Sequence, residues 1–99
     1  MDNIFNTFQF RFEPLFLTEE QIVEDVLSKL NAEDRLKLRS IPFEELIGFH
    51  SNFGQQIRNK YKLWDVSNPY THHVDDHPDH PDNLSFRIIQ TVWLRIIPY

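Results

Sequence analysis

The chain contains 99 residues, 40% of them hydrophobic, with no cysteine and a formal net charge of −5. This length suits one small domain with a single core, and the lack of cysteine excludes disulfides and thiolate metal ligands. The excess of acidic side chains argues against a nucleic-acid partner, because phosphate-binding surfaces depend on clustered Lys and Arg.

Residues 1–17 form a Phe-rich arm that precedes a helical domain at residues 18–99. The arm lacks the pattern of a signal peptide, and no segment of the sequence could span a bilayer, so we expect a cytoplasmic protein without a membrane partner. Phenylalanines alternate from residue 8 to residue 12, as in a strand. Phenylalanines of the arm also recur at helical spacing, but Pro14 opposes a continuous helix through this stretch. The five phenylalanines of the arm are Phe5, Phe8, Phe10, Phe12 and Phe16.

Two conformations of the arm are consistent with this pattern. In the first, the arm is extended and its phenylalanines cover the helical core. In the second, it is a short β-strand, which must pair with another strand because a lone strand cannot satisfy its own backbone. Its pairing partner would be the C-terminal "LRIIPY", a second copy of the chain or a target protein.

The domain begins with two predicted helices, at residues 18–30 and 31–41. Thr18 and Gln21 are spaced as a capping box, and the apolar residues that follow lie on one face of a helix. Asn31 is a second N-cap, followed by acidic residues that suit the positive end of a helix dipole. The second helix is short, because its apolar residues form no regular stripe.

Residues 42–61 predict one continuous helix, the longest of the chain, with Pro42 at its start. Its apolar residues recur at three- and four-residue steps and so share a face. His50 lies at the centre of that face, where we interpret it as a core histidine bonded to a carbonyl or a carboxylate. Gly54 would let another helix approach closely. The residues of this face are Phe43, Leu46, Ile47, His50, Phe53, Gly54, Ile57 and Tyr61.

Residues 62–82 read as a long loop with three prolines, and a last helix follows it. The wide apolar arc of this helix predicts that it is central to the core. The arc consists of Leu84, Ile88, Ile89, Val92, Trp93 and Ile96. The fold class is therefore mainly α, a bundle of about four helices in which 42–61 and the last helix form the core pair. A short strand in the arm and at "IIPY" is the alternative to an all-helical chain.

The loop contains the stretch "HHVDDHPDHPD", which suggests a metal site. Imidazoles and carboxylates could hold a divalent metal such as Zn or Ni. The metal-ligand candidates are His72, Asp76, His77 and His80. The alternative is a polar loop without a cofactor, in which Pro81 and Asp82 start the last helix and metal binding is adventitious.

Two motifs resemble a family of small bacterial and phage proteins known as a domain of unknown function. The stretches "FEELIGFHSNFGQQIRNKYKLW" and "HPDHPDNLSFRIIQTVW" carry the resemblance, which covers about residues 18–97. The matching positions are Phe49, His50, Gly54, Ile57, Arg58, Asn59, Leu63, Trp64, His80, Pro81, Asp82 and Ser85. The resemblance implies a mostly helical fold and no settled activity.

The polar and aromatic motif positions form a candidate binding cluster of His50, Arg58, Asn59, Trp64, His80 and Asp82. A structural role is the simplest one. Arg58 and Asn59 would end a helix, Trp64 would fill the start of the loop, and Asp82 would pair with Arg58 to hold its far end. If the protein has a ligand pocket, these residues would line it.

The sequence contains no catalytic motif, so the leading hypothesis is a non-catalytic protein-binding module of the inhibitor or immunity type. The Phe-rich arm and the acidic helical surface would contact a protein partner, which could present a basic surface. Two alternatives remain. One is a metal-dependent enzyme or metal-binding protein that uses the His/Asp loop, and the other is a homo-oligomer, for example a homodimer that buries the arm.

Overall fold

The computed structural model describes residues 15–96, which contain four α-helices, one 3-10 helix and no strand. The elements are α2 (Glu19–Lys29), α3 (Ala32–Arg39), η1 (Phe43–Phe49), α4 (Phe53–Lys60) and α5 (Pro81–Ile96). The predicted mainly α fold is confirmed for this part of the chain. Of the arm, only residues 15–17 are described, and Phe16 is half-buried; Ile96 of the predicted strand at "IIPY" is the last residue of α5, and residues 1–14 and 97–99 lie outside the described part of the chain. None of the described helices is long and apolar enough to cross a membrane.

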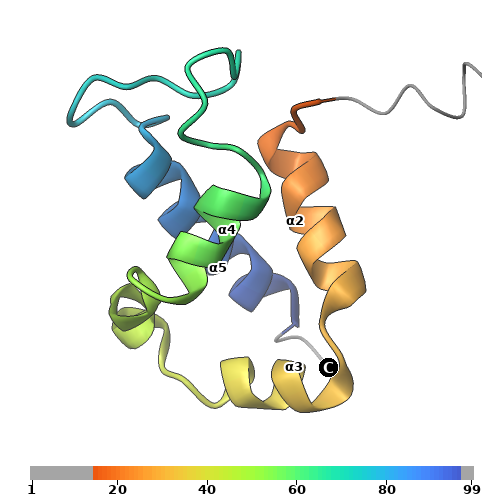
Figure 1. Ribbon diagram of the computed structural model, residues 1–99. Helices are drawn as coiled ribbons and strands as arrows, with labels where there is room; N and C mark the ends of the chain where they lie inside the picture. Colours follow the sequence, from red (N-terminus) through yellow and green to blue (C-terminus); the bar gives the residue numbers. More distant parts are fainter. Residues whose placement is uncertain (1–14, 97–99) are drawn as a thin grey trace, which may run out of the picture.

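Helix α5 is the central element, as its wide apolar arc predicts. It contacts α2, α3, η1 and α4, and in Figure 1 it passes behind α4, with α2 to its right and α3 below. Five aliphatic side chains of α5 are at most 2% exposed: Leu84, Ile88, Ile89, Val92 and Ile96. The other helices make few contacts with one another, so the core is a layer of side chains around one helix.

Helices α2 and α3 begin where their capping residues predict. The Thr18 hydroxyl accepts the Gln21 N–H at 3.2 Å, and the Gln21 side chain accepts the Thr18 N–H at 2.9 Å. Asn31 caps α3 by accepting the Asp34 N–H at 2.8 Å. These bonds satisfy backbone N–H groups that have no partner within the helix. Arg35 of α3 donates to the carbonyl of Leu27 at 2.6 Å and thereby caps the end of α2.

The predicted continuous helix at residues 42–61 is wrong. Residues 43–49 form η1, in which hydrogen bonds span three residues, as from the Glu45 N–H to the Pro42 carbonyl at 2.9 Å. Helix α4 begins only at Phe53, whose N–H is accepted by the Asn52 side chain. Such a side chain offers the backbone an alternative to helical bonding. The longest helix is instead α5, with 16 residues.

The interruption between η1 and α4 changes which side chains of this region are buried. Leu46 and Ile57 both reach the core and are 0% and 2% exposed. Phe43 and Ile47, which a continuous helix would have placed on the same buried face, are 36% and 58% exposed. The break therefore lets η1 and α4 pack against α5 separately. The single apolar face predicted for residues 42–61 does not form.

Charged side chains join α2 to α5 along their exposed edges. Arg87 donates to both carboxylate oxygens of Glu19, each at 2.8 Å. In the last turn of α5, Arg95 contacts Glu20 at 2.8 Å and Glu24 at 2.9 Å. The bidentate bond with Glu19 is the more specific of the two contacts, because the fork of Arg87 matches the carboxylate geometry.

A hydrogen bond between Tyr61 and Asp25 joins the end of α4 to α2. The Tyr61 hydroxyl donates to the Asp25 carboxylate at 2.6 Å, and Lys29 donates to the same oxygen at 3.0 Å. The bond from Tyr61, followed by that from Lys29, holds the pKa of Asp25 below its ordinary value. Burial and the bond to Asp25 raise the pKa of Tyr61. Folding is therefore coupled to the ionised form of Asp25.

We expect Tyr61→Phe to destabilise the fold by about 1 kcal/mol at neutral pH, because it removes a hydrogen bond to a charged group. A lowered pKa stabilises the folded state fully above the unfolded pKa of about 3.9, and this stabilisation is lost as pH falls through the folded pKa. The difference in unfolding free energy between wild type and variant should therefore shrink from pH 6 to pH 3 in urea denaturation. Tyr70→Phe, on a side chain that is 44% exposed, is the control and should change stability little. A difference for Tyr61→Phe that is equal at both pH values would contradict the coupling.

Candidate functional site

The Arg58 guanidinium occupies the centre of the candidate binding cluster and is 8% exposed. It donates to the Ser85 hydroxyl at 2.9 Å and to the His50 carbonyl at 3.1 Å, and its Nε lies 3.6 Å from Asp82 Oδ1. The predicted pairing of Arg58 with Asp82 is therefore present. One side chain joins the end of η1, helix α4 and the first turn of α5, and a buried guanidinium requires such acceptors.

Gly54 makes room for this guanidinium. A Cβ atom at position 54 would lie 2.9 Å from Arg58 Nη1 and 3.7 Å from Ile89 Cδ1 of α5. The sequence suggested that this glycine admits a neighbouring helix. The tightest constraint is instead the side chain of Arg58, one turn along the same helix.

The Asp82 carboxylate faces two histidines as well as Arg58. His50 Nε2 lies 3.9 Å from Asp82 Oδ1, and His80 Nδ1 lies 4.0 Å from Oδ2. These distances permit electrostatic attraction but exceed those of direct hydrogen bonds. The Asp82 side chain is 44% exposed and that of His50 is 38% exposed. His50 is thus half-buried instead of a core histidine, and its backbone carbonyl, not its ring, is the group bonded to Arg58.

His80 links the start of α5 to Trp64. Its ring is 9% exposed, and Nδ1 accepts the Asp82 N–H at 3.2 Å, which satisfies a free donor of the first turn of the helix. The edge of the ring packs against Trp64 with centroids 5.2 Å apart, and Trp64 also meets His73 at 5.7 Å. Trp64 was predicted to fill the start of the loop. It does not, because it remains 47% exposed.

The fold gathers five of the six predicted cluster residues. Asn59 is exposed on α4 and makes none of the cluster's contacts. The sequence analysis gave no role to Ser85. Its hydroxyl donates to the Asp82 carbonyl at 3.0 Å. The spacing of three residues between Asp82 and Ser85 could have indicated this bond. His73 was also missed, and only the path of the loop places it against Trp64.

The cluster does not present an activated nucleophile. The Ser85 hydroxyl is 0% exposed, donates to the Asp82 carbonyl and accepts from Arg58. A catalytic serine needs an accessible oxygen and a base that accepts its proton. The cluster therefore fits a structural role, holding the end of the long loop to the core.

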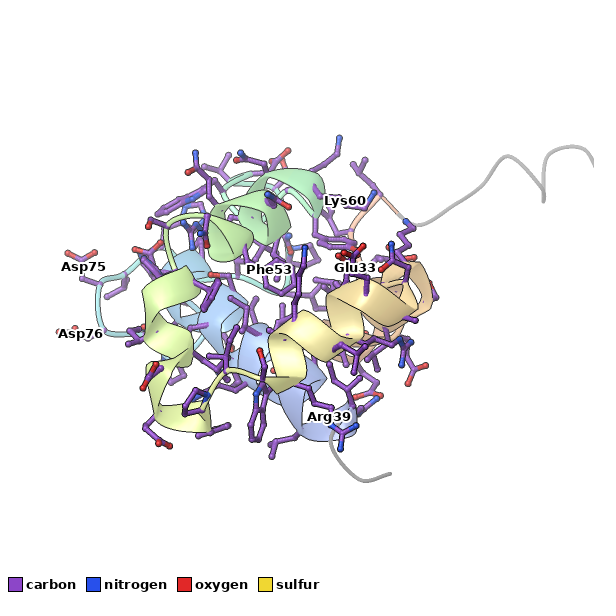
Figure 2. The ribbon with its side chains drawn as sticks, turned by 90° about the horizontal axis from the view of Figure 1, so that it is seen from below. Glu33, Arg39, Phe53, Lys60, Asp75 and Asp76 are labelled. Carbon is purple, nitrogen blue, oxygen red and sulfur yellow. The ribbon has the colours of Figure 1, made fainter. Side chains whose placement is uncertain are left out.

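The predicted metal ligands are only partly brought together. The rings of His72 and His77 stack with centroids 4.0 Å apart. His77 Nδ1 accepts the Asp79 N–H at 3.0 Å, and His80 Nδ1 is engaged at the helix start. Asp76 points outward together with Asp75 (Figure 2). Within residues 15–96, no group of three or more His, Asp or Glu side chains is placed to hold a metal ion.

The chain belongs to a protein family described as a domain of unknown function (DUF6794), whose sequence profile matches residues 20–96. The match spans the described helices almost completely and includes the Arg58 cluster. The expected membership of a family known as a domain of unknown function is thus confirmed. Neither the curated proteins nor the solved structures that were compared include a significant match to the chain.

We expect Arg58→Met to destabilise the fold by about 1–3 kcal/mol, because it leaves the Ser85 hydroxyl and the His50 carbonyl without their donor. Lys60→Met makes the same change of charge at an exposed position of α4, and its effect should stay within about 0.5 kcal/mol. Urea denaturation of the two variants measures the difference. Equal effects would mean that the guanidinium bonds contribute nothing specific.

We expect zinc or nickel to leave the melting temperature of the untagged protein unchanged. A metal that binds only the folded state must stabilise it, and the histidine contacts described above compete with metal ligation. Differential scanning fluorimetry with added metal, together with metal analysis after dialysis, provides the measurement. Stoichiometric metal and a rise in Tm that His77→Ala abolishes would restore the metal-site hypothesis.

Proposed function

We propose that the chain is a non-catalytic protein-binding module, as inhibitors and immunity proteins are, and that its contact surface is the α4–α5 loop, residues 61–80. The observation that carries this proposal is a tryptophan held at the surface between two histidines. Three further large apolar side chains of the loop are exposed. The exposed set is Trp64 at 47%, Val66 at 87%, Tyr70 at 44% and Val74 at 58%.

The loop has many internal bonds for a segment without regular structure. Leu63 is 1% exposed, and the Asn68 side chain donates to the Lys62 carbonyl at 3.1 Å and accepts the Tyr70 N–H at 2.8 Å. Farther along, the His72 N–H donates to the Asp79 carbonyl at 3.0 Å. A loop held in one shape loses less entropy on binding than a free one. Exposed apolar side chains on such a loop support an interface.

The far end of the loop is attached to α2 and α5. Arg87 donates to the Pro78 carbonyl at 3.0 Å and to the Asp79 carboxylate at 2.9 Å while it binds Glu19. The Asn83 side chain donates to the His77 carbonyl at 2.9 Å. These bonds connect the proposed contact surface to the core, which favours a preorganised surface over a loop that orders on binding.

The charge of the loop favours a basic partner surface. Asp65, Asp75 and Asp76 are exposed, and the Asp75 side chain is 97% exposed. Together with the net charge of −5, they would attract and orient a positively charged protein. A homodimer through this loop is less favourable, because a twofold interface would bring the same acidic side chains face to face.

The enzyme alternative has less support than the binding proposal. The buried Ser85 and the histidines engaged by backbone N–H groups leave the site without the groups that hydrolytic or metal-assisted chemistry needs. Of the arm that the sequence also suggested as a contact, residues 1–14 lie outside the described part of the chain. The proposal therefore rests on the loop alone.

We expect Trp64→Ala to weaken binding of a protein partner by about 30-fold or more, since interface tryptophans often contribute about 2 kcal/mol or more. Leu36→Ala, at a position of α3 that is 66% exposed, is the control and should bind as wild type does. Partners captured from the native host with the full chain would be tested against all three proteins by calorimetry. Equal affinity of the Trp64 and Leu36 variants, with unchanged melting temperatures, would refute the loop as the contact surface.

A further inference from the structure

A groove lies between α4 on one side and α2 and α3 on the other. Its larger part is a cavity of about 370 Å³, and a second part of about 170 Å³ adjoins it. Leu30, Phe53 and Gln56 line both parts, so the two cavities are adjacent. In Figure 2, Phe53 lies between α4 and α3.

The groove exists because the helices around α5 do not pack on one another. Helices α2, α3 and α4 each contact α5, and the main link between α2 and the end of α4 is the Tyr61–Asp25 hydrogen bond. Of the apolar side chains that line the groove, Leu30, Ile41 and Phe53 pack against the core cluster. These three and Phe49 are only half-buried.

We propose that residues 1–14 of the same chain occupy this groove, with phenylalanine side chains covering Leu30 and Phe53. This segment contains Ile4 and four phenylalanines, and its charged side chains are Asp2, Arg11 and Glu13. A largely apolar segment of low charge fits a groove whose floor is apolar. The rim carries Lys29, Lys37, Lys60 and Asp34, with Lys29 and Lys37 paired to Asp25 and Glu33, so a segment of low charge suits it.

The volume of the groove agrees with this occupant. A cavity of about 150 Å³ holds one benzene molecule. The larger part of the groove, at about 370 Å³, therefore has room for about two phenylalanine rings, and the smaller part, at about 170 Å³, for one. Such burial would remove apolar surface of both the segment and the groove from water, which is favourable.

The chain is long enough to reach the groove from the start of α2. Leu15 immediately follows the segment, and helix α2 from Glu19 to Lys29 is about 15 Å long. An extended chain advances about 3.3 Å per residue, so the nine steps from Leu15 back to Asn6 span up to about 30 Å. The N-terminal half of the segment can therefore lie beside Leu30 and Gln56 without any change in the helices.

This inference does not depend on the proposed function, because nearly all of the groove is lined by residues outside the α4–α5 loop. It assigns the Phe-rich segment to the stability of its own domain instead of to a partner. The aromatic side chains near the N-terminus then complete a core that the helices leave open.

Disulfide trapping tests the proposal, and the chain contains no native cysteine that would interfere. The test protein carries Asn6→Cys and Gln56→Cys, and the control carries Asn6→Cys and Ser28→Cys. Ser28 is exposed on α2, one turn or less from Leu30, and does not line the groove. Gln56 and Ser28 are both exposed. Circular dichroism would verify that both proteins are folded. Rates of intramolecular disulfide formation under oxidised glutathione are measured on non-reducing gels.

We expect the Asn6/Gln56 protein to cross-link at least about tenfold faster than the Asn6/Ser28 control, because docking raises the effective concentration above that of a free tether. Adding Phe5→Ser and Phe8→Ser to the test protein should reduce its rate to that of the control. Equal rates for the first two proteins would overturn the proposal. A faster product with the mass of a dimer would also overturn it, because it would place the segment of a second copy in the groove.

Discussion

Burial of helix α5 is the constraint on which the rest of the structure depends. Each of its buried aliphatic side chains gains about 1.5–3 kcal/mol on leaving water, and every other described element packs against this helix. Short elements such as η1 and α4, too short to be stable alone, can form because α5 supplies their apolar surface. The same arrangement leaves α2, α3 and α4 apart on their outer sides, which creates the groove beside Phe53. Core and groove are thus two consequences of packing around one helix.

The first turn of α5 connects this core to the surface. Arg58 of α4 pairs with Asp82 and donates to the Ser85 hydroxyl. The His80 ring accepts an N–H of the same turn and packs against Trp64. Arg58 is buried because it has several acceptors, and Gly54 leaves the space that it fills. The residues of a motif that resembles a ligand-binding set therefore mainly contact one another. Trp64, at 47% exposed, is the motif's most exposed aromatic member, and the proposed contact surface therefore begins where the cluster ends.

The parts that could be predicted are those governed by neighbours in sequence. The capping residues Thr18 and Asn31 mark their helix starts because their side chains bond N–H groups three residues away. The apolar arc of α5 repeats often enough to indicate a central helix. The pairing of Arg58 with Asp82 followed from opposite charges at the two ends of a loop. One continuous helix was wrongly predicted for residues 42–61. An Asn within an apolar pattern, such as Asn52, can either lie within a helix or cap the start of a new one.

By itself the sequence determined the helical class, the position of most helix boundaries, the central place of α5 and the residues that meet at its start. These follow from side-chain periodicity and short-range hydrogen bonding, which need no knowledge of distant contacts. Only the tertiary structure decided that η1 and α4 are separate, that His50 and Trp64 are at the surface, and that His77 and His80 bond backbone N–H groups. Each of these outcomes depends on which elements compete for the surface of α5 and on the path of the loop. Such competition is settled by packing in three dimensions, because residues far apart in the chain must share one limited apolar surface.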